Sequence, residues 1–164
     1  MASKDRSEPM VVGVGADASG FILKEAIRQL LETDPRVERV TDFGVYTADD
    51  PTFYSEIGLR VAERVRAGEL DRAILVCGTG IGMAISANKV PGVFATVAYD
   101  MYSVERSILS NNCQILCLGG KVISPELSRR IVDDWLGYTF DPSSRSAAKV
   151  AVIREYEHKS STAG

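Results

Sequence analysis

The sequence predicts an α/β fold in which helices cover both faces of a parallel sheet. Short apolar runs, typical of buried strands, alternate with longer segments of helical periodicity, and the alternation repeats five times. The chain has 164 residues, of which 45% are hydrophobic and 25% are charged, as in ordinary globular proteins with a substantial core. We therefore expect a single domain over residues 10–158, with disordered tails at residues 1–9 and 159–164.

The expected elements follow one another along the whole domain. We predict strands at residues 10–15, 37–41, 73–77, 93–98 and 114–118. We predict helices at residues 21–32, 53–67, 84–87, 102–109, 125–136 and 145–158. In the first helix, apolar periodicity separates a core face from a solvent face. The expected core face is Ile22, Ala26, Ile27, Leu30 and Leu31, and the expected solvent face is Lys24, Arg28 and Gln29.

The most informative segment is the third strand and the glycine loop after it. Cys77 ends an apolar run, and Gly78, Gly80 and Gly82 alternate directly behind it. In an open α/β sheet, ligands bind at the carboxyl ends of the strands. Glycines let backbone N–H groups approach an anion closely, and a helix N-terminus adds partial positive charge. We expect this field to favour the thiolate of Cys77, although a lone cysteine is often only a small core residue.

Composition excludes several classes of function. The net charge is −3 and no dense basic run occurs, which argues against a nucleic-acid or anionic-membrane partner. No apolar stretch reaches the length of a membrane span, and the polar N-terminus lacks the apolar core of a signal peptide. Cys77, Cys113 and Cys117 lack CxxC spacing, which favours reduced thiols in a cytoplasm. Because His158 is the sole histidine, a histidine base or a histidine-bound metal is not expected.

Other known motifs were weighed against this interpretation of the cysteine–glycine loop. Residues 13–18 formally satisfy a dinucleotide-binding fingerprint, but Gly13 falls within the strand and a small domain leaves no room for a second catalytic half. The cysteine–glycine loop is not a Walker A phosphate-binding loop, because Met83 stands where that loop requires a lysine. It is not a cysteine phosphatase loop of the C-x5-R kind either, because that loop requires an arginine at the same position. A thiol beside N–H donors instead suits enolisation, in which a base removes a carbon-bound proton and the donors stabilise the negative charge on oxygen.

Several polar side chains are candidates to join this site. Asp17 follows the first strand and Asn111 precedes the fifth, and we expect both at the same sheet edge, although each has a cap or turn role as its alternative. Arg145 and Lys149, four residues apart on the last helix, either form a solvated face or bind a phosphate. Tyr54 either lies flat against a sugar or packs at the start of its helix.

Three segments resemble a known enzyme family. Residues 77–82 (CGTGIG), 86–92 (SANKVPG) and 116–123 (LCLGGKVI) look like type B ribose-5-phosphate isomerases, a family that includes the galactose-6-phosphate isomerase subunits. The resemblance covers about residues 10–157. It implies a Rossmann-like three-layer sandwich with a five-stranded parallel sheet, and a homodimer or homotetramer with sites at the dimer interface. It also implies no metal or organic cofactor.

The resemblance further implies the roles of individual residues in an aldose–ketose isomerisation through an enediolate. Cys77 matches the family's proton-transferring cysteine. The backbone amides of Gly78, Gly80, Ile81 and Gly82 match its anion hole. The positions that match substrate contacts are Asp17, Tyr54, Thr79 and Asn111, and Thr79 is also a candidate to assist ring opening.

The chain departs from the family pattern at specific positions. Ala18 and Ser110 stand where the family has histidines, the second of which is credited with opening the sugar ring. Lys121 and Lys149 replace two phosphate-binding arginines, whereas Arg145 is kept. Ribose 5-phosphate is still the leading expected substrate, because the family that the sequence resembles is named for it. A tetrose 4-phosphate, which cannot close a furanose ring, is the alternative, and a catalytically weak sugar-phosphate-binding protein is a third possibility.

Overall fold

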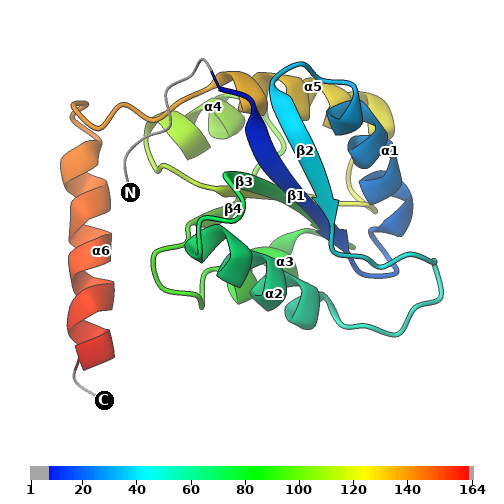
Figure 1. The fold of residues 1–164 in the computed structure, drawn as a ribbon, viewed down its shortest axis with the longest axis horizontal. Helices are drawn as coiled ribbons and strands as arrows, with labels where there is room; N and C mark the ends of the chain where they lie inside the picture. Colours follow the sequence, from blue (N-terminus) through cyan, green and yellow to red (C-terminus); the bar gives the residue numbers. More distant parts are fainter. Residues whose placement is uncertain (1–7, 163–164) are drawn as a thin grey trace.

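The computed structural model describes residues 8–162 and has the predicted α/β fold (Figure 1). Five parallel strands form one sheet in the order β2-β1-β3-β5-β4. The strands are β1 (Met10–Ala16), β2 (Val37–Asp42), β3 (Arg72–Cys77), β4 (Ala95–Val97) and β5 (Ile115–Gly119). The central strands β3 and β5 are buried almost throughout, as expected for a parallel sheet covered on both faces.

Helices cover the two faces of the sheet in separate layers (Figure 1). The first layer contains α1 (Phe21–Glu32), α4 (Met101–Leu109) and α5 (Pro125–Gly137), and the second contains α2 (Tyr54–Arg66) and α3 (Ile81–Ala87). Successive side chains of β3 alternate between the layers, since Val76 packs in the first and Cys77 in the second. Cys77 therefore faces α2 and α3.

The two glycines of the apparent dinucleotide fingerprint have a packing role. A Cβ atom on Gly15 would lie 2.7 Å from Ile57 of α2, and one on Gly13 would lie 2.7 Å from Leu70. The side chains of Ile57 and Leu70 cannot shift to make space for a Cβ atom, because both are packed in the same buried core. The glycines allow α2 and the chain after it to pack closely on β1.

Helix α1 has the predicted bounds, but two of its side chains are placed opposite to expectation. Ile22 is 75% exposed, whereas Lys24 is fully buried. The Lys24 Nζ atom donates to both carboxylate oxygens of Asp42 and to the carbonyl oxygen of Val45. A buried ammonium is tolerated where it is paired and hydrogen-bonded in this way. Hydropathy alone assigned Lys24 to solvent because its partner lies in another element.

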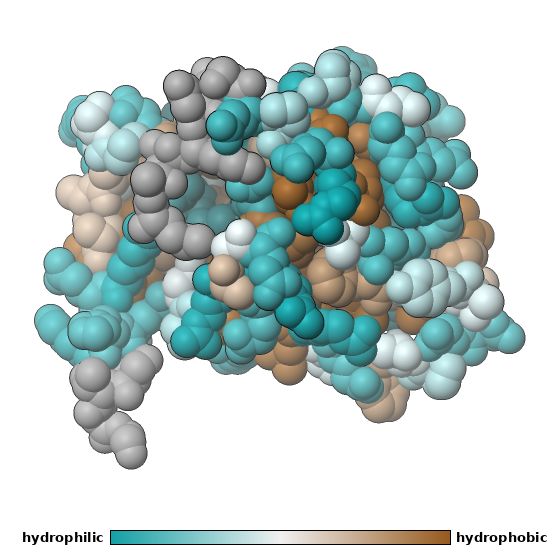
Figure 2. Space-filling view, viewed as in Figure 1, coloured by the Kyte–Doolittle hydropathy of each residue, from teal (hydrophilic) through white to brown (hydrophobic). Residues whose placement is uncertain are grey.

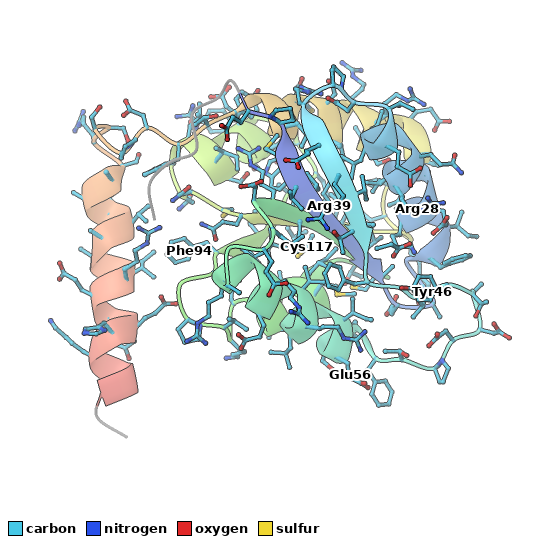
Figure 3. The ribbon with its side chains drawn as sticks, in the orientation of Figure 1. Arg28, Arg39, Tyr46, Glu56, Phe94 and Cys117 are labelled. Atoms are coloured by element: carbon cyan, nitrogen blue, oxygen red, sulfur yellow. The ribbon has the colours of Figure 1, made fainter. Side chains whose placement is uncertain are left out.

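Helix α6 (Ala147–Thr162) stands apart from the layers, at the side of the molecule (Figure 1). Its Val150 packs with Phe94 and Cys113, which precede β4 and β5, and Figure 3 shows Phe94 on the side that faces α6. The helix runs through residues 159–162, so the expectation of a disordered tail is wrong for these residues. Glu8 and Pro9 are described and precede β1, while the expected disorder at 1–7 and 163–164 lies outside the described residues.

Within residues 8–162, no helix is both long and apolar enough to cross a membrane. The same residues contain no group of three or more histidine, cysteine, aspartate or glutamate side chains arranged to hold a metal ion.

Candidate active site

Three loops meet at the carboxyl edge of the sheet. Backbone hydrogen bonds join them, from the Gly120 N–H to the Cys77 carbonyl oxygen at 2.8 Å and from the Lys121 N–H to the Gly78 carbonyl oxygen at 3.1 Å. The Asp17 N–H donates to the carbonyl oxygen of Val76 at 3.2 Å. The chain segments that follow β1, β3 and β5 therefore form one connected base around Cys77.

Cys77 is buried at the end of β3, with 4% of its surface exposed. Its Sγ atom accepts a hydrogen bond from the Gly80 N–H at 3.1 Å. Gly80 precedes α3 with a φ of +77°, a conformation that glycine adopts without steric cost. A donor aimed at sulfur stabilises a thiolate more than a thiol.

The loop also has N–H groups that are available to a substrate. In the described part of the chain, the N–H groups of Gly78, Thr79 and Gly82 have no hydrogen-bond partner. The Ile81 N–H makes only a long contact of 3.4 Å with the Thr79 hydroxyl oxygen. These donors are suited to hold an oxygen that becomes negative during the reaction.

Three predicted side chains lie around this loop. The ring of Tyr54 lies against the start of α3, because a Cβ atom on Gly82 would be 2.5 Å from it. The Lys121 Cδ atom is 3.8 Å from where a Cβ on Gly78 would stand. Asp17 accepts from the Gly20 N–H at 3.0 Å, so it has the turn role that was its alternative and also lies at this edge. We call the set Asp17, Tyr54, Cys77, residues 78–82 and Lys121 the carboxyl-edge group.

The remaining predicted residues lie at the opposite edge of the sheet. Ser110 caps the end of α4 and Asn111 precedes β5. Because the strands are parallel, a residue before one strand and a residue after another are at opposite edges, and the expectation that Asn111 shares an edge with Asp17 is wrong. Arg145 and Lys149 flank the start of α6, which packs beside the amino ends of β4 and β5. We call Ser110, Asn111, Arg145 and Lys149 the amino-edge group.

Tyr99 belongs to the carboxyl edge but was not predicted from the sequence. It follows β4, and its hydroxyl donates a hydrogen bond to the carbonyl oxygen of Thr79. Burial, together with the nearby thiols of Cys77 and Cys117, raises the pKa of the Tyr99 phenol. Its place directly after the fourth expected strand was the available signal, since that position falls at the edge where ligands bind.

The other two cysteines are core residues. Cys117 lies inside the sheet (Figure 3), and burial raises its pKa well above the usual value. Burial also raises the pKa of Cys113 to about 12. Both side chains therefore remain neutral thiols around neutral pH.

Comparison with known proteins identifies the family. A family model described as Ribose/Galactose Isomerase matches residues 12–153. The chain belongs to this family. A D-erythrulose-4-phosphate isomerase 2 of Mycolicibacterium smegmatis is 54% identical over 144 residues, which cover 88% of this chain and 95% of the relative. Ribose-5-phosphate isomerase B of Escherichia coli is 37% identical over 149 residues, 90% of this chain and 97% of the relative.

A solved member of the ribose/galactose isomerase family has the same fold. The ribose-5-phosphate isomerase B structure from Clostridium thermocellum superposes with a TM-score of 0.85 at 41% identity and covers 92% of this chain and 99% of its own. The resemblance found in the sequence is thus confirmed, and so is the Rossmann-like α/β fold. The chain is an aldose–ketose isomerase of phosphorylated sugars.

Proposed function

We propose that the preferred substrate is a tetrose 4-phosphate, converted between D-erythrulose 4-phosphate and D-erythrose 4-phosphate. The observation that carries this proposal is Ser110, which stands where the resemblance to type B ribose-5-phosphate isomerases implies a ring-opening histidine. A tetrose 4-phosphate needs no such acid, because its O4 carries the phosphate and the furanose ring cannot form. Relatives named for D-erythrulose 4-phosphate, at 54% and 38% identity, support the same choice.

Ribose 5-phosphate, the leading expectation from the sequence, is the second candidate. Two relatives named for this activity, the ribose-5-P isomerase B of Listeria innocua and the ribose-5-phosphate isomerase B of Escherichia coli, are 39% and 37% identical to this chain. A pentose 5-phosphate is mainly a furanose in water, so its isomerisation needs a proton donor for the ring oxygen. The Ser110 hydroxyl is a much weaker acid than a histidine, and the Thr79 hydroxyl would have to serve instead.

In the proposed mechanism, Cys77 is the base that moves a proton between C1 and C2. The thiolate removes the proton from C1 of the ketose, and the electron pair forms the enediolate as negative charge develops on the C2 oxygen. The free N–H groups of Gly78 and Gly82 stabilise this charge, while the Thr79 hydroxyl exchanges the proton between the two oxygens. Cys77 then returns its proton to C2, and the thiolate is regenerated.

We further infer that the active site is completed by a second copy of the chain. The carboxyl-edge and amino-edge groups are separated by the length of β5, five residues or about 16 Å, so one copy cannot bring them together. In a homodimer, Arg145 of the partner subunit and Lys149 of the partner subunit would bind the phosphate beside Lys121. Exposed apolar side chains on α6 (Val152, Ile153 and Tyr156) and beside Cys77 (Ile81 and Ile85) support such an interface.

Apolar side chains also contribute to the surface of the molecule. Figure 2 shows apolar side chains that reach the surface among polar ones on the lower part of the face in view.

The three cysteines are buried free thiols, which supports the proposal that the enzyme works in a reducing cytoplasm.

The substrate proposal is tested by comparing kcat/KM for D-erythrose 4-phosphate and D-ribose 5-phosphate on the same preparation. We expect a preference of about tenfold or more for the tetrose, in line with the loss of one positioned acid. Ser110→His should raise activity on ribose 5-phosphate and leave the tetrose nearly unaffected. Ser103→His, on an exposed position of the same helix, is the matched control. A tenfold preference for the pentose, with no gain in Ser110→His, would contradict the proposal.

A further inference from the structure

One peptide group connects Tyr99 to Cys77. The Tyr99 hydroxyl donates to the carbonyl oxygen of Thr79. The N–H of Gly80, at the other end of the same Thr79–Gly80 peptide group, donates to the Cys77 Sγ atom at 3.1 Å. The three groups form a continuous hydrogen-bonded relay from the phenol to the thiol, and they join the chain after β4 to the loop after β3.

The peptide group transmits both direction and polarity. It is planar and rigid, so holding its carbonyl oxygen also sets the direction of its N–H. A hydrogen bond to the carbonyl polarises the N–H and strengthens it as a donor, by about 10–30% per bond. A stronger donor at Sγ favours the charged form of the cysteine.

We propose that Tyr99 is a positioning residue for the isomerisation, which orients and polarises the Gly80 N–H and thereby keeps Cys77 as a reactive thiolate. The inference rests on the proposed role of Cys77 as the base. Tyr99 itself needs no contact with the substrate to act in this way.

The surroundings hold the relay in place. A Cβ atom on Gly119 would lie 2.8 Å from the Tyr99 hydroxyl oxygen, so a glycine at the end of β5 leaves the room that this hydroxyl occupies. On its other side, Gly80 lies against the backbone of Cys117, and a Cβ there would be 3.0 Å from the Cys117 carbonyl. The peptide group is thus confined between β5 and the Tyr99 hydroxyl.

The relay also needs Tyr99 to remain a donor while Cys77 is charged. Burial and the neighbouring thiols of Cys77 and Cys117 raise the pKa of Tyr99, so the phenol keeps its proton. The other ionisable side chains at this edge are Asp17 after β1, Tyr54 at the start of α2 and Lys121 after β5, and the thiol of Cys117 in β5 also lies near Cys77. None of them is the donor to the Thr79 carbonyl, so Tyr99→Phe removes that hydrogen bond and leaves these groups in place.

The direct test is the pH profile of Cys77 alkylation by iodoacetamide in the absence of substrate, followed on the Cys77 peptide by mass spectrometry. Tyr99→Phe removes the hydroxyl and keeps the ring. Without this hydroxyl the Thr79–Gly80 peptide group is no longer held, and its N–H turns away from Sγ. We expect the profile to shift to higher pH, so that alkylation at about pH 7 slows by about threefold to tenfold, the effect of losing the hydrogen bond from the Gly80 N–H to Sγ. At alkaline pH the two rates should converge. Tyr102→Phe, on an exposed ring three positions further along, should match the parent protein.

The kinetic readout is the split between kcat and KM for D-erythrose 4-phosphate. In Tyr99→Phe we expect kcat near neutral pH to fall by the same factor as alkylation, with KM changed by less than about twofold. An unshifted alkylation profile, or a rate reduced equally at all pH values, would overturn the relay. A shifted profile with unchanged kcat would overturn the role of Cys77 as base, and so separates a failure of the proposed mechanism from a failure of the relay.

Discussion

The Nζ atom of Lys24 lies 2.9 and 2.8 Å from the two carboxylate oxygens of Asp42, with the lysine side chain fully buried. The same ammonium donates to the carbonyl oxygen of Val45 at 2.9 Å. Val45 in turn donates its N–H to the carbonyl oxygen of Ala16, which directly precedes Asp17. Lys24 therefore ties α1 to the loop after β2 and supports the edge of the sheet where Asp17 lies.

Loss of this buried charge should strongly destabilise the fold. Lys24→Met leaves the Asp42 carboxylate without its buried partner, and we expect a loss of about 3–5 kcal/mol in the free energy of unfolding by urea. The double variant Lys24→Met/Asp42→Asn should recover part of this loss, because residue 42 then carries no charge and Glu25, the other carboxylate paired with Lys24, keeps its ion pair with Arg28. Arg28→Met, which breaks partly exposed ion pairs, should cost less than about 1 kcal/mol. A Lys24→Met variant as stable as Arg28→Met would contradict the prediction that the buried Lys24–Asp42 pair is needed for stability.

Replacement of Cys77 tests the proposed base. We expect Cys77→Ala to lower kcat by about 10²-fold or more, since a positioned general base contributes roughly 10² to 10⁴. Cys113→Ala removes a buried thiol far from the carboxyl edge and should keep most of the activity. Steady-state kinetics on both variants, with circular dichroism to confirm folding, decide the point. Near-normal turnover in Cys77→Ala would show that another group moves the proton.

Complementation between variants tests the shared active site. We expect Cys77→Ala and Arg145→Glu each to be nearly inactive, the second mainly through a higher KM because the phosphate loses a cation. Co-expressed copies should recover about a quarter of the parental activity, because half of the dimers would be mixed and each mixed dimer would keep one intact site.

The control pairs two variants of the carboxyl-edge group, Cys77→Ala with Asp17→Ala, which cannot assemble an intact site and should stay inactive. Light scattering should give at least twice the 17.8 kDa mass of one chain. A monomer mass at micromolar concentration, or equal recovery by both pairs, would disprove the composite site.

The buried thiol of Cys113 predicts a loss of stability at alkaline pH. Its pKa is raised by burial from 9.0 to about 12, so below about pH 9 both folded and unfolded chains carry the proton and stability is unaffected. Above that pH the unfolded chain releases the proton first, and the contribution of Cys113 to the free energy of unfolding should fall by about 1.4 kcal/mol per pH unit until about pH 12.

The measurement is urea unfolding at several pH values for the parent protein and Cys113→Ala. The variant should lose stability less steeply between about pH 9 and pH 11, while the difference between the two proteins stays constant near pH 7. Identical slopes at alkaline pH would show that Cys113 ionises freely in the folded protein.

The local pattern of the sequence was enough to predict the elements, the parallel sheet and the cysteine–glycine loop. Alternating strand and helix periodicity determines which segments are buried, and α1 has the bounds that its periodicity predicts. The placement of Cys77 beside N–H donors also follows from adjacent residues, because Gly80 is only three positions away. These features depend on neighbours along the chain, so the sequence by itself determined them.

Tertiary structure alone decided the features that depend on partners distant in the sequence. Lys24 is buried because Asp42, 18 residues away, pairs with it. The Tyr99 hydroxyl reaches Thr79 because β4 and β3 lie on either side of β5 in the same sheet. Asn111 falls at the edge opposite Asp17 because one precedes its strand and the other follows its own. Side-chain pairing and edge placement are set by how the chain crosses the sheet, and local periodicity does not carry that information.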